Sequence, residues 1–458
     1  MVLGTADDVV RAPDLVSAKA QMTMLRLAGF RSVRITSIWQ PGLSAPTARE
    51  LAALRIVEGA AQLSAIRVFV AVYPAGSRTT PLTPVDQADF ASYTAALVRA
   101  LPSFNDVIVG NEPNLNRFWL PQYGPGGENV AAPSYLSLLA QSYDALKASD
   151  PSVRVWGGAL APRGVDKPNT GRDTHSPTKF ITDLGVAYRA SGRQARIMDG
   201  LAIHPYGENS STPPTFAHPN STAIGIADYP KLVALLGQAF DGTAQPGSTL
   251  PILYAEYGVE TVVPPGKAHL YTGAEPATTR PVDETTQAER YEEALQLAFC
   301  QPTVSGFFVF HAQDEAALGS WQSGVLYADG TPKASQPLVR DAFELARDGS
   351  IARCPGLELP VAATTLRYPT RAEIRKVGLR VRLRCSLDCI YSVRLRKLPA
   401  GSTTRAKRGY SRAGRLAIAD LGRGRVARGS YYFTLSLIHP VNPASTPTLL
   451  QSGPLQLP

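Results

Sequence analysis

The feature that most constrains the fold of this chain is a regular alternation of two patterns over its first 350 residues. Short apolar runs rich in β-branched residues, which predict buried strands, alternate with stretches of helical periodicity. Strands separated by helices form parallel sheets, and eight such repeats favour a closed (β/α)8 barrel over an open sheet. No glycine loop of the nucleotide-binding kind follows any strand, which weakens the open-sheet alternative.

The expected barrel elements can be read from the sequence with their bounds. Seven strands are predicted at Ser32–Ile38, Ile66–Tyr73, Asp106–Asn111, Val153–Gly158, Met198–His204, Leu250–Glu256 and Gly306–His311, with Val2–Gly4 as a short first strand. Helices are predicted at Leu15–Ala28, Ala48–Leu63, Pro84–Leu101, Pro133–Ser149, Thr178–Ala190, Tyr229–Phe240, Thr286–Phe299 and Ser335–Arg347.

After Pro360 the pattern changes to short segments that alternate apolar and polar residues. These segments predict a small antiparallel β-sandwich, with strands at Leu379–Leu383, Ile390–Leu395, Arg415–Ile418 and Ser430–Ile438. We therefore expect two domains, a (β/α)8 TIM barrel over residues 1–356 and a C-terminal sandwich over residues 361–458.

Charge divides the chain at the same place. The net charge is +9, but residues 361–458 hold 18 Lys and Arg against three acidic residues, so that the tail carries +15 and the rest −6. A basic module can bind nucleic acid or an acidic polymer; alternatively, alternating arginines such as those of Arg380–Arg384 mark the solvated face of a sheet. No Trp follows Trp321, so stacking on neutral sugars is poorly supported. We expect an acidic polymer, and not nucleic acid, as any ligand of this domain.

The four cysteines of the chain indicate in which kind of cellular compartment the protein works. Cys300, Cys354, Cys385 and Cys389 lack the spacing of a zinc site or a redox motif, and their even number favours two disulfides and an oxidising compartment over free buried thiols. Cys385 and Cys389 have a spacing that suits a small disulfide loop. No apolar run is long enough to span a membrane, and no signal peptide is recognisable at Met1–Asp8. The cysteines lead us to expect a secreted or extracytoplasmic protein.

Two predicted strands deliver a glutamate at their carboxyl ends. One is followed by Asn111-Glu112-Pro113 and the other ends on Glu256. The carboxyl ends of barrel strands meet at the face where such barrels keep their chemistry, so the two carboxylates are expected in one pocket. Paired carboxyl groups are the catalytic groups of glycoside hydrolysis. One donates a proton to the departing oxygen, and the other stabilises the developing oxocarbenium ion.

With these positions fixed, residues 1–350 resemble glycoside hydrolase clan A, the retaining (β/α)8 hydrolases, with families 39 and 5 nearest. The positions that carry the resemblance are Arg34, Asn111-Glu112-Pro113, His204-Pro205-Tyr206, Glu256 and the segment Gly324–Lys333. The resemblance implies that Glu112 is the acid/base and Glu256 the nucleophile of an enzyme that cleaves β-glycosidic bonds of plant or microbial oligo- or polysaccharides. It implies no cofactor and no metal.

Further residues are expected to bind substrate. Tyr206 is a plausible hydrogen-bond donor to Glu256, Arg34 its charge partner, and Asn111 a partner of the sugar 2-hydroxyl. Many clan members have a tryptophan at the end of strand eight, whereas Phe308–Glu315 contains none, so His311 or Trp321 would replace it. Trp39, Trp119 and Trp321 are candidates for the sugar cleft or, alternatively, plain core aromatics.

Each candidate residue has a structural alternative. The Asn-Glu-Pro triplet also fits a capped turn, Glu256 and Arg34 fit structural ion pairs, and His204 fits a satisfied core histidine.

No G-x-S-x-G or H-E-x-x-H motif is present, which argues against a serine hydrolase and a zinc protease. Asp7, Asp8, Asp314 and Glu315 have no metal-ligand spacing. A second hypothesis remains, a catalytically inactive barrel that binds carbohydrate.

Overall fold

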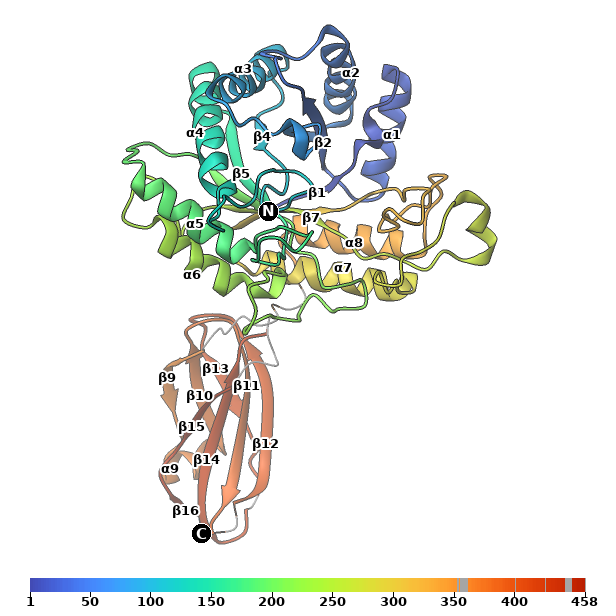
Figure 1. Ribbon diagram of the computed structural model, residues 1–458. Helices are drawn as coiled ribbons and strands as arrows, with labels where there is room; N and C mark the ends of the chain where they lie inside the picture. Colours follow the sequence, from blue (N-terminus) through green and yellow to red (C-terminus); the bar gives the residue numbers. More distant parts are fainter. Residues whose placement is uncertain (352–353, 355–360, 400, 425, 441–446, 458) are drawn as a thin grey trace. The chain divides into compact units, whose positions relative to one another are not determined.

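The computed structural model describes the chain except for residues 352–353, 355–360, 400, 425, 441–446 and 458 (Figure 1). Contacts divide it into two compact units, Met1–Ser350 and Ile351–Pro458. The change of pattern predicted at Pro360 falls outside the described residues. Within the described part, no helix is long and apolar enough to cross a membrane.

The first unit is built on a closed barrel of eight parallel strands, as predicted. Each strand pairs with the next, and β8 closes the barrel by pairing with β1. The strands are β1 (Val2–Ala6), β2 (Ser32–Trp39), β3 (Arg67–Pro74), β4 (Asp106–Val109), β5 (Arg154–Leu160), β6 (Gly200–Ile203), β7 (Ile252–Tyr257) and β8 (Val304–Val309).

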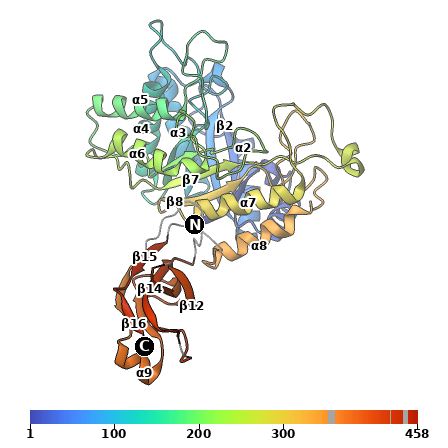
Figure 2. The same ribbon diagram turned by 90° about the horizontal axis from the view of Figure 1, so that it is seen from below.

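Helices follow the strands and cover the outside of the barrel. Figure 2 shows α7 and α8 lying side by side on one flank, and these two helices are in contact. The helices are α1 (Leu15–Leu27), α2 (Ala48–Ser64), α3 (Pro84–Ala100), α4 (Ala131–Ser149), α5 (Pro177–Ala190), α6 (Tyr229–Phe240), α7 (Glu284–Phe299) and α8 (Ser335–Arg347). Several begin where a side chain caps the first turn, as Thr47 does for α2 and Asp283 for α7.

Side chains fill the lumen of the barrel. Its central cluster combines large and small residues from different strands: Phe69, Ala71, Ile108, Trp156, Ala159, Ala202, Leu253, Ala255 and Phe308. At the amino ends of the strands the buried Asp106 accepts hydrogen bonds from the Trp156 indole at 3.0 Å and from Arg67, and pairs with Arg154 at 2.8 Å. This network lies at the amino end of the barrel, and barrels of this kind keep their sites at the opposite, carboxyl end.

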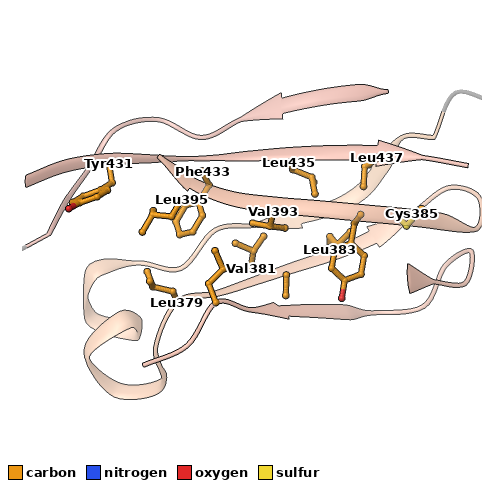
Figure 3. Packing of buried hydrophobic residues seen from close by; sticks show 14 of the residues in the cluster. Leu379, Val381, Leu383, Cys385, Val393, Leu395, Tyr431, Phe433, Leu435 and Leu437 are labelled. Atoms are coloured by element: carbon orange, nitrogen blue, oxygen red, sulfur yellow. A yellow bond between two sulfur atoms is a disulfide. The ribbon is translucent and has the colours of Figure 1, made fainter. Parts of the chain in front are cut away.

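The second unit is a sandwich of two antiparallel sheets, again as predicted. One sheet has the order β13-β10-β9; the other has the order β12-β11-β14-β15, with β16 also pairing with β14. Figure 3 shows the apolar side chains of both sheets meeting between them, among them Val381, Leu383, Val393, Phe433 and Leu435. The elements are β9 (Ala363–Arg367), α9 (Arg371–Val377), β10 (Arg380–Cys385), β11 (Cys389–Lys397), β12 (Ser402–Ser411), β13 (Ala417–Asp420), β14 (Gly429–Ile438), β15 (Thr448–Gln451) and β16 (Leu455–Leu457).

Several strands of this unit were not expected from the sequence. The longest, β12, lies at a sheet edge and is polar and exposed along most of its length, so it lacks the alternation that marks β10 and β11. The cysteines agree with the prediction: Cys385 and Cys389 form a disulfide between β10 and β11, and Cys300 and Cys354 are disulfide-bonded as well. The alternative of free thiols is therefore wrong.

Candidate active site

Glu256 lies near the carboxyl end of β7 with its side chain turned into the barrel mouth. Only 8% of the residue is exposed. Its carboxylate accepts a hydrogen bond from the Tyr206 hydroxyl at 2.9 Å and a further one from the Arg34 guanidinium on β2, and lies 3.4 Å from Nδ1 of His204. The expected pairing of Glu256 with Arg34 and Tyr206 is thus present in the structure.

The surroundings of Glu256 favour its ionised form. Burial by itself raises the pKa of this carboxyl, but the electrostatic effects of His204 and Arg34, together with the hydrogen bonds from Arg34 and Tyr206, outweigh it and lower the pKa below its usual value. Arg34 also donates to Oδ1 of Asn111 at 2.9 Å, which ties the end of β2 to the end of β4. A carboxylate held in this way stays charged and fixed in direction.

Glu112 reaches the same mouth from the loop after β4. Its backbone has φ of 41°, a left-handed conformation that residues other than glycine rarely adopt, and its amide donates to the carbonyl of Ala159 at 2.9 Å. A strained backbone of this kind costs on the order of 1–3 kcal/mol and is concentrated at functional sites. The Glu112 carboxylate lies 2.9 Å from Nδ1 of His204.

The two carboxylates and the imidazole form one cluster. One oxygen of Glu112, one of Glu256 and a ring nitrogen of His204 all lie within 4.8 Å of one another. Such atoms can also ligate a metal ion. However, both oxygens of Glu256 already accept hydrogen bonds, one from Arg34 and one from Tyr206. The positive charge of the Arg34 guanidinium beside the carboxylate also repels a metal cation. The arrangement is better suited to proton transfer and nucleophilic attack.

A cavity of about 390 Å³ opens above the cluster. Of the predicted site residues, the cavity is lined by Arg34, Asn111, Glu112, Tyr206, Glu256, His311 and Trp321. His204 lies beneath the two carboxylates and is fully buried. The Trp321 ring packs against Tyr206 at 5.0 Å between centroids and against Phe310 at 5.3 Å. Trp321 thus presents an aromatic surface in the absence of a tryptophan on Phe308–Glu315.

Two of the candidate tryptophans do not reach this cavity. Trp39 is fully buried; its indole donates to the Leu43 carbonyl at 2.8 Å and its ring packs against Phe90. Trp119 packs against Tyr135 in the core. Successive residues of a strand point to opposite faces, so a position at the end of a strand does not decide whether a side chain faces the lumen or the helices.

Other lining residues were not singled out from the sequence. Tyr73, Arg117 and Phe118 line the cavity, and Tyr73 stands near the end of β3 as Glu256 stands near the end of β7. The acidic residues considered above have structural partners: Asp7 accepts hydrogen bonds from the amides of Ala312 and Gln313, and Asp314 forms a buried ion pair with Lys333 at 2.9 Å.

A second cavity, of about 540 Å³, adjoins the first. The two share Glu112, Tyr206 and Trp321 as lining residues, whereas Glu256 lines only the first. The second cavity is also lined by charged and polar residues: Arg163, Arg172, Glu208, Asn209, Ser210, Glu260, Thr278 and Thr279. The two together form a cleft with Glu112 between its halves.

Comparison with known proteins supports the fold. No family model and no curated protein sequence matches this chain. Among solved structures, a GH5_18 variant from Streptomyces cattleya in complex with Manβ1-4GlcNAc is similar at 17% identity and a TM-score of 0.50, over 76% of this chain and 81% of that one. A GH5_18 protein from Bifidobacterium longum subsp. infantis is similar at 15% identity and a TM-score of 0.50, over 77% and 80%.

Two further similarities are weaker. A GH39 β-xylosidase from Caulobacter crescentus has a TM-score of 0.47 at 15% identity, over 92% of this chain and 93% of that one. β-Glucuronidase 2 from Bacteroides uniformis has a TM-score of 0.46 at 12% identity, and the chain spans 45% of its length. At 17% and 15% identity, the two GH5_18 structures with TM-scores of 0.50 show similarity of fold alone.

Proposed function

We propose that this protein is a retaining glycoside hydrolase that cleaves β-glycosidic bonds of a plant or microbial oligo- or polysaccharide. The observation that carries the proposal is the meeting of Glu112 and Glu256, from distant parts of the sequence, within 4.8 Å at one barrel mouth. The likeness of the fold to GH5_18 structures supports it. Closely spaced carboxylates are the arrangement of the retaining mechanism, because an inverting enzyme needs room for a water between them.

The unequal surroundings of the two carboxyl groups support different roles for them. Glu256, ionised and held by Arg34 and Tyr206, attacks the anomeric carbon and forms a glycosyl ester. Glu112 gives its proton to the departing oxygen, so that the leaving group departs as an alcohol. Glu112 then takes a proton from a water that attacks the same carbon, and the ester bond to Glu256 breaks. Both carboxyl groups return to their starting states.

The remaining lining residues would hold the sugar. Asn111, fixed by Arg34 through its oxygen, offers its amide group to the 2-hydroxyl, a bond that strengthens in the transition state. Trp321 and His311 replace the strand-eight tryptophan as walls of the innermost subsite. The aromatic face of Trp321 suits the apolar face of a sugar ring.

A panel of 4-nitrophenyl β-glycosides tests the proposal. We expect turnover of at least one sugar, with the β-anomer as the first product detected by NMR. An α-anomer as first product would contradict retention. Binding of sugars without turnover of any panel member would support the alternative, a catalytically inactive barrel that binds carbohydrate.

We further propose that the C-terminal unit binds an acidic polymer on the outer face of its five-stranded sheet. Ser392, Arg394 and Arg396 alternate along β11 with buried residues, and together with Thr434 and Ser436 of β14 they line a cavity of about 380 Å³. Phosphate, sulfate or carboxylate groups suit arginine and hydroxyl donors. The sheet face is therefore a candidate site for a carboxylated polysaccharide.

The positions of the acidic residues in this unit make the five-stranded sheet a better candidate for binding an acidic polymer than the three-stranded sheet. Glu373 pairs with Arg367 on β9, and Asp420 of β13 pairs with Arg380 on β10. The third, Asp388, accepts a hydrogen bond from the Tyr410 hydroxyl. Two of the three acidic residues of the tail therefore pair with arginines of the three-stranded sheet, whereas no acidic side chain among the described residues pairs with Arg394 or Arg396 of β11.

Two matched double variants of the full chain test this surface. Arg394→Gln with Arg396→Gln removes two charges from the five-stranded sheet, and Arg382→Gln with Arg384→Gln removes two exposed charges from the other. With polygalacturonate as probe we expect the first pair to weaken binding at least tenfold and the second less than threefold, with steep weakening by salt. An equal loss of polygalacturonate binding in both double variants would mean that binding depends on net charge alone and not on this sheet face. Tighter binding of duplex DNA than of polygalacturonate would identify nucleic acid as the ligand.

The disulfides bear on where the protein works. Cys385–Cys389 and the disulfide-bonded Cys300 and Cys354 require an oxidising environment to form. We propose that the protein acts outside the cytoplasm, where extracellular polysaccharides are accessible to it. Mass spectrometry of protein isolated from its source, with and without reduction, checks whether the cysteines are oxidised.

A further inference from the structure

The cleft contains a third buried carboxyl group that the double-displacement mechanism does not use. Glu260 follows β7 by three residues, is only 7% exposed and lines the second cavity. Its Oε2 accepts one hydrogen bond, from the amide of Gln322 at 3.3 Å. Within the described part of the chain, no basic side chain lies within ion-pair distance of it.

Lys333, whose charge acts to lower the pKa of Glu260, is already engaged by other groups. The Lys333 ammonium donates to Oδ1 of Asp314 at 2.9 Å, to Thr261 at 2.7 Å and to the carbonyl of Gln322 at 2.9 Å, which uses its three hydrogens. Burial and the neighbouring charges of Glu275 and Asp314 raise the pKa of Glu260 to about 7. A buried glutamate without a charge partner is rare and destabilising, so its position calls for a role other than folding.

The lining of the two cavities gives the cleft a direction. On the proposed mechanism Glu256 must reach the anomeric carbon, and it lines only the first cavity. Glu112 must reach the glycosidic oxygen, and it lies between the two. The sugar that forms the glycosyl ester therefore occupies the first cavity, and the leaving group extends into the second, toward Glu260.

We propose that Glu260 recognises a sugar as the leaving group, by accepting hydrogen bonds from its hydroxyls. The inference rests on the proposed glycosidase function. The second cavity is rich in polar residues such as Arg163 and Asn209, and its aromatic lining residues are Tyr206 and Trp321. This combination suits a hydroxylated ring stacked on one face. The natural substrate is then an oligosaccharide with a sugar on both sides of the scissile bond, and not a glycoside of an apolar alcohol.

The test compares two substrates with the same cleaved sugar, which is chosen as the best of the aryl glycoside panel. One has 4-nitrophenol as leaving group and the other a second sugar. For Glu260→Leu, which is similar in size but accepts no hydrogen bond, we expect the ratio of kcat/KM for the disaccharide to that for the aryl glycoside to fall at least tenfold. Glu260→Gln keeps an acceptor and should recover part of the ratio.

A control and a binding measurement separate the possible outcomes. Glu275→Gln removes a nearby negative charge that does not line the cavity, and should change the ratio less than threefold. Calorimetry of the free leaving-group sugar against protein with Glu256→Ala should show weaker binding when Glu260→Leu is added. Equal losses on both substrates, or an unchanged ratio, would overturn the assignment. Absence of turnover by the unaltered protein would instead count against the glycosidase itself.

Discussion

The two units of this protein differ in whether they also bury charged residues. In the barrel, ionic groups converge inward, as in the buried pairs Arg34–Glu256 and Lys333–Asp314. In the sandwich, the interior is apolar and arginines alternate outward along β10 and β11. Parallel strands buried on both faces bring polar residues together only at their ends. Antiparallel strands with one solvent-exposed face carry polar residues along the whole of that face. The first arrangement suits catalysis and the second suits binding of a polymer.

If the inward charges of the barrel are catalytic, Glu256→Ala should have the largest effect of any substitution. Without the nucleophile no glycosyl ester forms, so kcat on a 4-nitrophenyl β-glycoside should fall by several orders of magnitude. Thermal unfolding shows whether the variant is still folded. Near-normal turnover by a folded variant would remove Glu256 from the mechanism.

Glu112→Ala should cost less, because 4-nitrophenolate departs with little need of a proton. We expect a loss on the order of 10²–10⁴-fold on sugars with poor leaving groups, the usual range for a general acid, and a smaller loss on aryl glycosides. Added azide should restore turnover of the aryl glycoside and yield a β-glycosyl azide. An α-azide from this variant would mean that the roles of Glu112 and Glu256 are reversed.

Arg34→Gln tests whether charge keeps the nucleophile ionised. The positive charge and hydrogen bond of Arg34 lower the pKa of Glu256, so their removal should raise it. Because the attacking group must be ionised, the acidic limb of the profile of kcat/KM against pH should move to higher pH. A loss of activity with an unchanged acidic limb would restrict Arg34 to a positioning role.

Much of this site could be predicted from the sequence because its parts stand at the ends of strands. The apolar runs before Glu112 and Glu256 locate both residues, and the likeness of the motifs to clan A adds Arg34 and Tyr206. Which face a strand-end side chain adopts could not be predicted, as Trp39 illustrates. Glu260 was also missed, since it lies in a loop whose approach to Gln322 depends on tertiary packing. In the sandwich, the polar edge strand β12 left no periodic signal.

Removal of the C-terminal unit should have only a small effect on catalysis if the two units divide their work as proposed. A chain that ends at residue 356 keeps Cys300 and Cys354, and every residue that lines the two cleft cavities. We expect its kcat/KM on a small aryl glycoside to stay within a few-fold of the full chain, while binding to polygalacturonate disappears. Loss of small-substrate activity in a folded truncated protein would show that the sandwich contributes to the cleft.

The smallest effect expected is a gain in stability from Glu260→Gln. The folded-state pKa of Glu260, about 7, lies above the ordinary value of 4.5, so the folded protein favours the neutral form and the ionised form destabilises it. This destabilisation is small below pH 4.5 and complete above pH 7. Glutamine cannot ionise and still accepts from the Gln322 amide, so the variant should gain about 1–2.5 kcal/mol more in the free energy of unfolding at pH 8 than at pH 5. Urea unfolding followed by tryptophan fluorescence reports on the barrel alone, because all four tryptophans belong to it. A variant that is more stable yet loses selectivity for a sugar leaving group would show that the barrel keeps Glu260 for recognition at the expense of stability.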